Sequence, residues 1–244
     1  ITGAAQGIGR AIAEAYVAHG ANVLLVDVNE EKVKKAASEI NDQNSSHAKY
    51  MVMDVSNENN VDAAVQKSID EFGHLDIMVN NAAVLKAHLI VDFPLKDWQD
   101  IFRVNMQGTF LCSRAAARQM IKQEIAGSII NIASASARKA DSKHAAYSSS
   151  KAAIVAFTRI LALELGEYGI RANAILPGAT MTEMLQDVFD RVPGIREDLI
   201  GKTVLGKLGQ PEDQANAAVF LGSDMASHIT GEHLIVSGGE FMNP

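Results

Sequence analysis

Short apolar runs alternate with longer amphipathic segments along most of the chain. The apolar runs have the length of buried strands, and the amphipathic segments have the length of surface helices. We therefore expect strands at residues 22–27, 50–54, 75–79, 128–133, 171–176 and 234–236. We expect helices from a glycine-rich turn to Ala18 and at 30–40, 58–72, 145–165 and 211–221, with a longer helical region at 95–123 in one or two parts.

This alternation predicts the fold class. Repeated strand–helix units give a parallel sheet with helices on both faces, and right-handed crossovers make that sheet doubly wound. Because no linker, repeat or low-complexity block interrupts the pattern, we expect a single α/β domain over residues 1–244. The least regular segment, 177–209, predicts a loop-and-helix insertion, and residues 181–208 are the expected lid over a substrate.

The first two residues, Ile1 and Thr2, have the character of the end of a strand. Neither an initiator methionine nor a signal peptide precedes them. We therefore expect a short N-terminal segment before Ile1, outside this sequence.

Composition narrows the functional classes. Of 244 residues, 48% are hydrophobic and 21% are charged, and the formal net charge is −7. This acidic balance disfavours binding to nucleic-acid phosphates, and no apolar run approaches the about 18 residues of a membrane span. A lone cysteine, Cys112, fits a reducing compartment such as the cytoplasm. We expect a small-molecule substrate and no nucleic-acid, membrane or metal partner.

The glycine-rich turn reads Gly3-x-x-x-Gly7-x-Gly9 and follows a strand end. Glycines let the backbone approach a pyrophosphate closely, and the next helix offers free N–H groups with partial positive charge. A glycine triplet alone also fits an ordinary strand-to-helix turn. The strand before it and Asp27 after it favour a dinucleotide site.

Asp27 ends the second strand, where a carboxylate can accept hydrogen bonds from both ribose hydroxyls of NAD. A 2′-phosphate would carry roughly −1.5 to −2 charge and be repelled there. Gln6 precedes Gly7 in place of Arg or Lys, and no nearby basic residue compensates, so we predict NAD rather than NADP. Read alone, Asp27 also fits a turn or cap residue.

Two further strand ends carry polar residues. Asp54 and Val55 could meet adenine through a carboxylate and a backbone N–H, although an Asx turn explains Asp54 equally well. Asn80, Asn81 and Ala82 end the next strand. Ligands of open α/β sheets bind outside the carboxyl ends of the strands, where all of these residues fall.

The catalytic prediction rests on Ser134, Tyr147 and Lys151. Tyr147 and Lys151 lie one turn apart on a predicted helix, and Ser134 follows a strand end. An ammonium and a nicotinamide cation can lower the tyrosine pKa from about 10, so that the phenol accepts an alcohol proton. Ser134 would donate to the substrate oxygen. A Tyr-x-x-x-Lys pair alone is more often a surface feature, and the upstream serine is what favours catalysis.

Together these motifs resemble the short-chain dehydrogenase/reductase family. They stand in the family's order and spacing over nearly the whole chain, as Thr2-Gly3-x-x-x-Gly7-x-Gly9, Asp54-Val55, Asn80-Asn81-Ala82, Asn105, Ser134, Tyr147-x-x-x-Lys151 and Pro177-Gly178. The resemblance implies a Rossmann-type sheet, a nicotinamide cofactor and a mechanism that uses serine, tyrosine and lysine.

The resemblance also implies residue roles. An asparagine like Asn105 kinks its helix, and its main chain holds a water that links the lysine to solvent. Thr180 would meet the nicotinamide carboxamide, and Thr182 the carboxamide or the pyrophosphate. The implied catalytic residues are Asn105, Ser134, Tyr147 and Lys151. The implied cofactor-binding residues are Gly3, Gln6, Gly7, Ile8, Gly9, Asp27, Asp54, Val55, Asn81, Ala82, Tyr147, Lys151, Pro177, Gly178, Thr180 and Thr182.

Similar enzymes are commonly tetramers, so the resemblance implies a homotetramer or homodimer built on helices 95–123 and 145–165. Small residues at Ala152, Ala153 and Ala156 would allow close packing of helices, between chains or against this chain's own sheet.

Two positions depart from the family pattern. Ala83 stands where glycine is frequent, and Ser237 stands where aspartate is usual.

Three segments are expected to wall the substrate pocket: 84–88, 134–147 and 181–208. The expected substrate contacts are Ser134, Ser136, His144, Tyr147 and Met184. Arg138, Lys139 and Lys143 fit a polyhydroxy or anionic substrate, although unrelated charges on a solvated loop are the more ordinary interpretation.

Three functions remain open. The first is an NAD-dependent dehydrogenase of a secondary alcohol, such as a sugar, a polyol or a small diol, with a dihydrodiol as one variant. The second is a reductase of 3-oxoacyl thioesters, which usually needs NADPH and is disfavoured by Asp27. The third is a dinucleotide-sensing or scaffolding protein without catalysis, which the presence of both Tyr147 and Lys151 disfavours.

Overall fold

The computed structural model describes residues 1–44 and 47–241. Its strands are β1 (Val23–Asp27), β2 (Ala48–Val52), β3 (Ile77–Asn80), β4 (Ser128–Ile132), β5 (Arg171–Pro177) and β6 (His233–Val236). Every strand pairing among the described residues is parallel, in the orders β1–β2 and β3–β4–β5–β6. The predicted parallel sheet is confirmed, and its hydrogen-bonded ladder comes in two parts.

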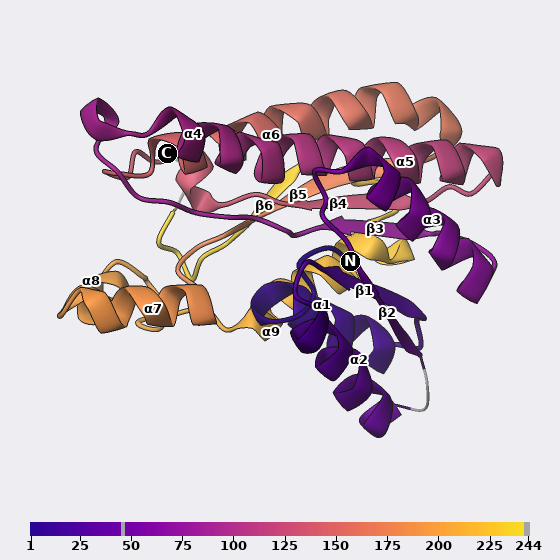
Figure 1. The fold of residues 1–244 in the computed structure, drawn as a ribbon, viewed down its shortest axis with the longest axis horizontal. Coiled ribbons are helices and arrows are strands. Elements are labelled where there is room, and N and C mark those ends of the chain that lie inside the picture. Colours follow the sequence, from indigo (N-terminus) through magenta and orange to yellow (C-terminus); the bar gives the residue numbers. More distant parts are fainter. Residues whose placement is uncertain (45–46, 242–244) are drawn as a thin grey trace.

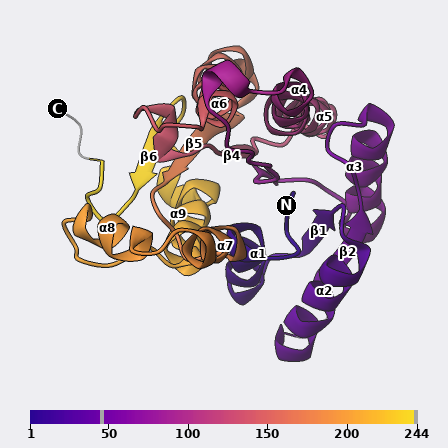
Figure 2. The ribbon, with the colours of Figure 1, turned by 60° about the vertical axis from the view of Figure 1, so that its left-hand side comes forward.

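The chain start lies between the two parts of the sheet, in the middle of the molecule (Figure 2). The Thr2 N–H donates to the Val79 carbonyl at 3.0 Å, and the Val26 N–H donates to the Ile1 carbonyl at 3.0 Å. Ile1 and Thr2 therefore pair with β1 on one side and β3 on the other, as expected for the end of a strand.

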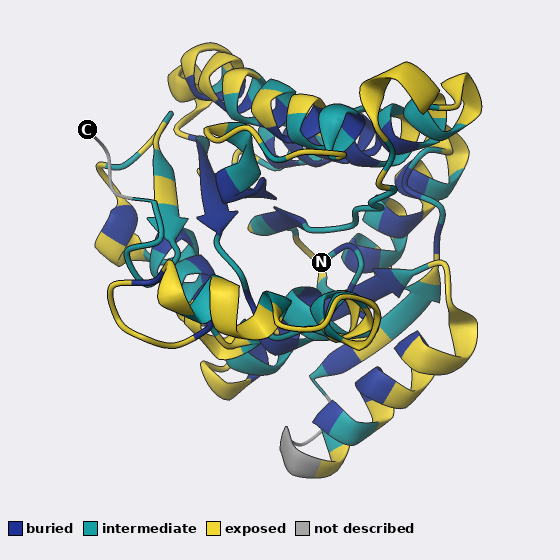
Figure 3. Ribbon diagram, turned by 90° about the vertical axis from the view of Figure 1, so that its left-hand side faces the viewer, coloured by how far each residue is buried: buried dark blue, intermediate teal, exposed yellow. Residues whose placement is uncertain are grey.

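Helices cover both faces of the sheet (Figure 1). They are α1 (Gly7–Ala18), α2 (Glu30–Asn44), α3 (Glu58–Phe72), α4 (Leu95–Phe102), α5 (Gly108–Lys122), α6 (Ala145–Leu165), α7 (Glu183–Arg191), α8 (Ile195–Gly201) and α9 (Pro211–Gly222). One apolar core joins the sheet to α1, α2 and α9, and another joins it to α3, α5 and α6. Buried residues follow the strands and the inner helix faces, while α7 and α8 are mostly exposed (Figure 3). No helix in the described part of the chain is long and apolar enough to cross a bilayer.

Local signals explain why several helix boundaries were predictable. The predicted helix 58–72 matches α3, because the Asn57 side chain accepts from the Asn60 N–H at 3.2 Å and Gly73 ends the helix with φ +86°. The predicted helix 145–165 matches α6. The expected insertion at 177–209 contains α7 and α8.

The region predicted as one or two helices at 95–123 contains two α-helices joined by a wider turn. Residues Arg103–Gln107 form a π-helical segment between α4 and α5, with Asn105 buried inside it. Such segments interrupt helices chiefly at functional sites. The break at Asn105 that the family resemblance implies is therefore present as a π-turn.

Strand edges are where prediction was least accurate. The strand expected at 50–54 is β2, which begins and ends two residues earlier because Val23 pairs with Ala48. The strand expected at 75–79 is β3, which begins at Ile77. The helix expected at 30–40 continues to Asn44. Strand limits depend on the partner strand, which a local pattern does not contain.

Candidate active site

Polar residues gather where the parallel strands end. Asp27 and Asn80 are the last residues of β1 and β3, Ser134 lies two residues beyond β4, and Pro177 ends β5. The carboxyl ends of parallel strands meet at one edge of a sheet, which is where ligands bind in open α/β folds. The structure thus brings the predicted cofactor and catalytic segments to a common edge.

The glycine-rich turn forms a cradle with no room for side chains. A Cβ at Gly9 would lie 2.3 Å from the Gly3 carbonyl oxygen, and Gly3 and Gly7 have φ of +62° and +56°. No acidic residue occupies the first turn of α1, and its N-cap, Gln6, makes no capping side-chain bond. Free N–H groups at a helix start fit a pyrophosphate, so the residues present, with Ile8 in that first turn, fit a bound dinucleotide.

Thr2 and Asn81 fasten this turn to the end of β3. The Thr2 Oγ1 accepts from the N–H groups of Asn81 at 2.9 Å and Ala82 at 3.0 Å. The Asn81 amide donates to the carbonyls of Thr2 and Gly3, both at 3.0 Å. The side-chain role of Thr2 was absent from the predicted site, and its place directly before Gly3 was the available signal.

Asp27 lies at the glycine-rich turn, as predicted. Its carboxylate accepts from the Ala5 N–H at 3.2 Å and from the Asn29 N–H at 3.0 Å. Because each carboxylate oxygen has further lone pairs, these bonds leave room for a ribose diol.

The expectation that no basic residue lies near Gln6 is wrong. The Lys32 Nζ lies 2.6 Å from the Gln6 Oε1 and 2.7 Å from a Glu183 carboxylate oxygen. The sequence separation of these residues hid the contact, since Lys32 lies in the first turn of α2 and Glu183 begins α7. A cation therefore stands beside the turn that Asp27 also touches.

Asp54 makes the Asx turn that its sequence position allowed. Its Oδ1 accepts from the Ser56 N–H at 2.9 Å, and its Oδ2 lies 3.4 Å from the Arg103 guanidinium. Burial works against ionisation, but the hydrogen bonds from Ser56 and the charge of Arg103 hold the pKa of Asp54 below its usual range. Val55 is buried against Gly108, where a Cβ would lie 2.6 Å from a Val55 methyl.

The three predicted catalytic side chains lie together at the start of α6. Lys151 is buried, and its Nζ lies 5.7 Å from the centre of the Tyr147 ring. The same Nζ donates to the Ile132 carbonyl at 2.7 Å. Ser134 hydrogen-bonds the Tyr147 phenol, which connects the end of β4 to the helix.

Burial acts on both titrating groups, in opposite senses. It lowers the pKa of the Lys151 ammonium to about 7. It also raises the pKa of Tyr147, although the bond from Ser134 opposes the rise. Without a bound cofactor, the protein therefore does not lower the pKa of Tyr147. The expected effect of the neighbouring lysine is outweighed because both groups are desolvated and Lys151 is bound to a carbonyl.

Asn105 uses its side chain to hold the segment that follows β3. Its Oδ1 accepts from the Val84 N–H at 2.8 Å, and its Nδ2 donates to the Val84 carbonyl and to the Ser150 Oγ, both at 3.1 Å. Its own carbonyl accepts from the Thr109 hydroxyl at 2.7 Å. Ser150, which sequence reasoning did not select, thus ties the π-segment to the helix that carries Tyr147.

The segment after β5 leads from the sheet to residues 181–208, which were predicted to form a lid. A Cβ at Gly178, the residue after Pro177, would lie 2.6 Å from the Ser237 Cβ. The Thr180 hydroxyl donates to the Gly178 carbonyl at 3.0 Å and accepts from the buried Gln214 amide at 3.3 Å.

Thr182 faces the glycine-rich turn. Its Oγ1 caps α7 by accepting from the Leu185 N–H at 3.3 Å, and its methyl lies 3.3 Å from the place of a Cβ on Gly7. A hollow beside Gly7 runs between α1 and α7. This closeness agrees with the proposed part of Thr182 in holding a pyrophosphate.

The predicted substrate residues other than Ser134 and Tyr147 lie in different surroundings. His144 lies beside Tyr147, with 6.3 Å between the ring centres, and makes no capping bond at the start of α6. The Ser136 hydroxyl donates to Asp141 at 3.0 Å. Met184 is 46% exposed on α7, and its contact with a substrate stays a prediction.

In loop 134–147, Arg138 and Lys139 have local partners. Arg138 contacts the His233 ring at 3.1 Å, and Lys139 lies 3.6 Å from Asp141. Lys143 is exposed with φ +70°. These contacts favour the interpretation of a solvated loop over that of a charged substrate site. No group of three metal-ligating side chains occurs among the residues described.

Comparisons with known proteins agree with this geometry. A family model described as enoyl-(acyl carrier protein) reductase matches residues 3–240. The chain is 35% identical to 3-oxoacyl-acyl-carrier-protein reductase FabG of Chlamydia muridarum, covering 98% of this chain and 95% of that protein. It is 38% identical to 2,5-dichloro-2,5-cyclohexadiene-1,4-diol dehydrogenase of Sphingobium indicum, covering 98% and 94%.

A solved structure shows the same fold. Sorbitol-6-phosphate 2-dehydrogenase of Erwinia amylovora superposes with a TM-score of 0.94 at 30% identity, over 99% of this chain and 98% of that one. Enzymes of this kind are oxidoreductases that use a nicotinamide cofactor. The glycine cradle, the strand-end asparagines and the Ser134–Tyr147–Lys151 cluster, taken with these matches, show that the chain belongs to the short-chain dehydrogenase/reductase family.

Proposed function

We propose that this protein is an NAD-dependent dehydrogenase that oxidises a secondary alcohol of a sugar, polyol or small diol. The observation that carries the proposal is the cluster of Ser134, Tyr147 and Lys151, at the same edge of the sheet as the glycine cradle that Asp27 touches. Ser134, Tyr147 and Lys151 lie close together, and each offers a chemical group suited to one step of the proposed reaction.

A bound nicotinamide supplies the hydride acceptor in this reaction. Tyr147 takes the proton from the alcohol oxygen, so that loss of a hydride from the same carbon leaves a neutral carbonyl. Ser134 donates a hydrogen bond to that oxygen as its charge changes. A positive charge at Lys151, less than 6 Å from the ring of Tyr147, favours the phenolate.

The proposed preference for NAD rests on the charges around the adenosine end of the cofactor site. Asp27 offers a carboxylate to the ribose hydroxyls and repels a 2′-phosphate. Lys32 is a cation at the same turn, but it is bound to Gln6 and Glu183. Because that lysine is already neutralised by a carboxylate, the charge of Asp27 decides the preference.

The substrate class follows from the site and the relatives together. The proteins named above that carry dehydrogenase names act on a cyclic diol and a polyol phosphate. In loop 134–147, Arg138 and Lys139 contact neighbouring side chains of the protein. An uncharged polyhydroxy substrate therefore fits better than an anionic one. The competing candidate, reduction of a 3-oxoacyl thioester, is supported by the likeness to FabG.

We further propose that the protein forms a homotetramer or homodimer and that it is located in the cytoplasm. The outward face of α6 carries Ala152 and Ala156, with Ile160 50% and Leu163 79% exposed. This apolar stripe does not face the chain's own sheet, and it fits a helix of a second copy.

The test is an absorbance assay of reduced nicotinamide, with NAD and then NADP offered against sugars, polyols, diols and an acetoacetyl thioester. The proposal predicts NAD-linked oxidation of one polyhydroxy class, with a higher kcat/KM for NAD than for NADP. NADPH-linked thioester reduction as the stronger activity would replace it with the reductase function.

A further inference from the structure

A glutamine amide is buried beneath residues 177–182, the segment that follows β5. Gln214 lies near the start of α9 and is fully buried. Its Nε2 donates to the Val236 carbonyl at 3.0 Å and to the Thr180 hydroxyl at 3.3 Å. These two bonds connect α9 to the end of β6 and to the segment expected to hold the nicotinamide.

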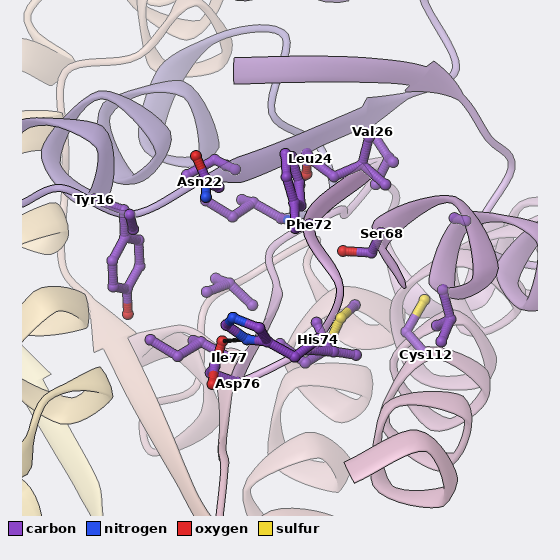
Figure 4. Close-up of a pocket in the computed structure, with 18 of the residues that line it drawn as sticks. Tyr16, Asn22, Leu24, Val26, Ser68, Phe72, His74, Asp76, Ile77 and Cys112 are labelled. Atoms are coloured by element: carbon purple, nitrogen blue, oxygen red, sulfur yellow. Dashed lines mark hydrogen bonds and ion pairs between the residues drawn. The ribbon is translucent and has the colours of Figure 1, made fainter. Parts of the chain in front are cut away.

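Helix α9 gives Gln214 a fixed base, because α1 packs closely against it. The Tyr16 hydroxyl of α1 donates to the Ala218 carbonyl, one turn after Gln214, at 2.7 Å. A Cβ at Gly222 would lie 2.3 Å from the same hydroxyl. Figure 4 shows Tyr16 at one side of a cavity between β1 and β3. Gln214 therefore belongs to a helix that is anchored in the core.

The side chain of Thr180 is turned toward Gln214 and away from solvent. Its hydroxyl donates to the Gly178 carbonyl at 3.0 Å while it accepts from the Gln214 amide. Thr180 as a whole is only 6% exposed. With its side chain bound on this side, the residue offers its backbone on the other.

The backbone groups of Thr180 point away from the neighbouring chain segment. The Gly209 N–H donates to the Ala179 carbonyl at 3.0 Å, and the Met181 N–H donates to the Gly209 carbonyl at 2.8 Å. In this parallel bridge, the N–H and the carbonyl of Thr180 face the opposite side.

These two groups lack a partner within the described part of the chain, although Thr180 is buried. Buried backbone groups are almost always paired, so an unpaired donor and acceptor at one residue need an explanation. A primary amide carries an acceptor oxygen and a donor NH₂. The free groups of Thr180 therefore match the carboxamide of nicotinamide, which Thr180 was expected to meet.

The amide of Gln214 is not explained by stability. Its Oε1 is buried and has no hydrogen-bond partner among the residues described, which costs free energy. The Val236 carbonyl does not depend on Gln214, since it also accepts from the Gly178 N–H at 3.0 Å. An apolar side chain of the same length would remove the unpaired oxygen and leave that carbonyl paired.

We propose that Gln214 is a positioning residue for the nicotinamide end of the cofactor site. It holds Thr180 by the hydroxyl, so that the N–H and the carbonyl of Thr180 are in place before the carboxamide binds. Binding groups that are already ordered lose less entropy when the ligand arrives. Gln214 itself does not contact the cofactor. The inference rests on the proposed function, because it concerns the same site.

The experiment measures the binding of NAD and of ADP-ribose by isothermal titration calorimetry. ADP-ribose has the adenosine, the pyrophosphate and the second ribose of NAD and lacks the nicotinamide ring. The test variant is Gln214→Met, which keeps the length of the side chain and removes its polar atoms. Asn216→Met, at an exposed position of α9, is the matched control. Urea unfolding of each protein is the second measurement.

Gln214→Met is expected to raise the dissociation constant for NAD by about 5-fold or more and to leave that for ADP-ribose within about 2-fold. Its urea midpoint is expected to equal or exceed that of the parent, because the unpaired Oε1 is gone. Asn216→Met should match the parent in all three quantities. Weaker NAD binding without loss of stability is the result of a positioning role and not of a packing role.

A second variant tests whether Gln214 acts through Thr180. Thr180→Val removes the hydroxyl that Gln214 holds. In a Thr180→Val background, Gln214→Met is expected to change the dissociation constant for NAD by less than about 2-fold. The same fold-change in both backgrounds would show that Gln214 acts by another route, and it overturns the proposal.

The remaining outcomes separate this inference from the proposed function. Unchanged NAD binding in Gln214→Met overturns the inference and leaves the proposed function standing. Equal weakening of NAD and ADP-ribose, a clearly lower urea midpoint, or failure of Gln214→Met to fold assigns Gln214 to packing and also overturns it. A parent protein that binds neither NAD nor ADP-ribose overturns the proposed function, and this inference with it.

Discussion

Lys151 bonds the Ile132 carbonyl in a buried position, and this burial lowers the pKa of its ammonium. Sequence spacing was enough to place Lys151 beside Tyr147, because residues four apart share a helix face. The direction of their pKa values was not predictable, since burial and hydrogen-bond partners come from tertiary packing. In the protein without cofactor, burial raises the pKa of Tyr147. A positively charged nicotinamide bound beside it would lower that pKa.

The buried lysine has a consequence for stability that can be measured. Its pKa of about 7 in the folded protein lies below the ordinary 10.5, so between these values the unfolded state binds more protons. The free energy of unfolding therefore rises with pH across this window. Lys151→Met should remove about 2 kcal/mol of that rise between pH 7 and pH 9.

Urea unfolding of both proteins at several pH values measures this difference. Lys34→Met, which removes an exposed lysine, is the matched control and should leave the pH dependence as in the parent. Parallel curves for the parent and Lys151→Met would show that Lys151 is not desolvated as described.

Cofactor preference is also decided by single residues. Asp27→Ala should lower the ratio of kcat/KM for NAD over NADP by at least about 10-fold, because it removes the charge that repels a 2′-phosphate. Lys32→Ala should reduce the use of NADP and leave kcat/KM for NAD within about 3-fold, since an exposed ion pair contributes little. An unchanged ratio in Asp27→Ala would contradict the assignment.

At the scale of elements, boundaries set by neighbouring residues in the sequence were predicted accurately, and features set by contacts between distant residues were not. Helix α3 was located because Asn57 and Gly73 carry its end signals in the local sequence. Strand β2 was misplaced by two residues because its pairing with β1 sets its limits. The contact of Lys32 with Glu183 was missed for the same reason, since it joins two elements distant in the chain.

The π-segment shows how one element positions another. Asn105 binds both polar groups of the Val84 backbone and the Ser150 hydroxyl. Asn105→Ala removes the partners of the partly buried Val84 N–H and carbonyl, while Ser150 keeps its bond to the Tyr147 carbonyl. The substitution should lower the free energy of unfolding by about 2 kcal/mol. It should also raise KM for the substrate, because segment 84–88 is then less firmly held.

Denaturant titration and steady-state kinetics check both effects. Gln107→Ala, an exposed position of the same segment, is the control and should change each quantity little. Wild-type stability and KM in Asn105→Ala would show that the side chain does not hold the segment.

At the scale of the whole molecule, the parallel sheet and its helical layers were predictable from the alternation of patterns, whereas the order of the strands was not predicted. The division of the hydrogen-bonded ladder beside Ile1 was not predicted as such, although the strand-end character of Ile1 and Thr2 pointed to it. Assembly depends on surfaces rather than on the core, and the exposed stripe on α6 is the feature to test.

Ala156→Glu should shift the proposed oligomer to smaller species, because it places a charge in a close helix contact. Size-exclusion chromatography with light scattering measures the mass. The exposed α3 position changed in Ala63→Glu provides the control, and its mass should equal that of the parent. A parent-like mass for Ala156→Glu would remove α6 from the interface.

The central claim is that Tyr147 transfers the alcohol proton. The most direct measurement is the turnover of Tyr147→Phe with the best substrate of the parent, beside NAD binding by the same protein. Loss of the phenol should reduce kcat by at least about 10²-fold while the dissociation constant for NAD stays within about 3-fold, since one lost hydrogen bond has a small net effect on binding. Parent-like turnover in Tyr147→Phe would contradict the mechanism.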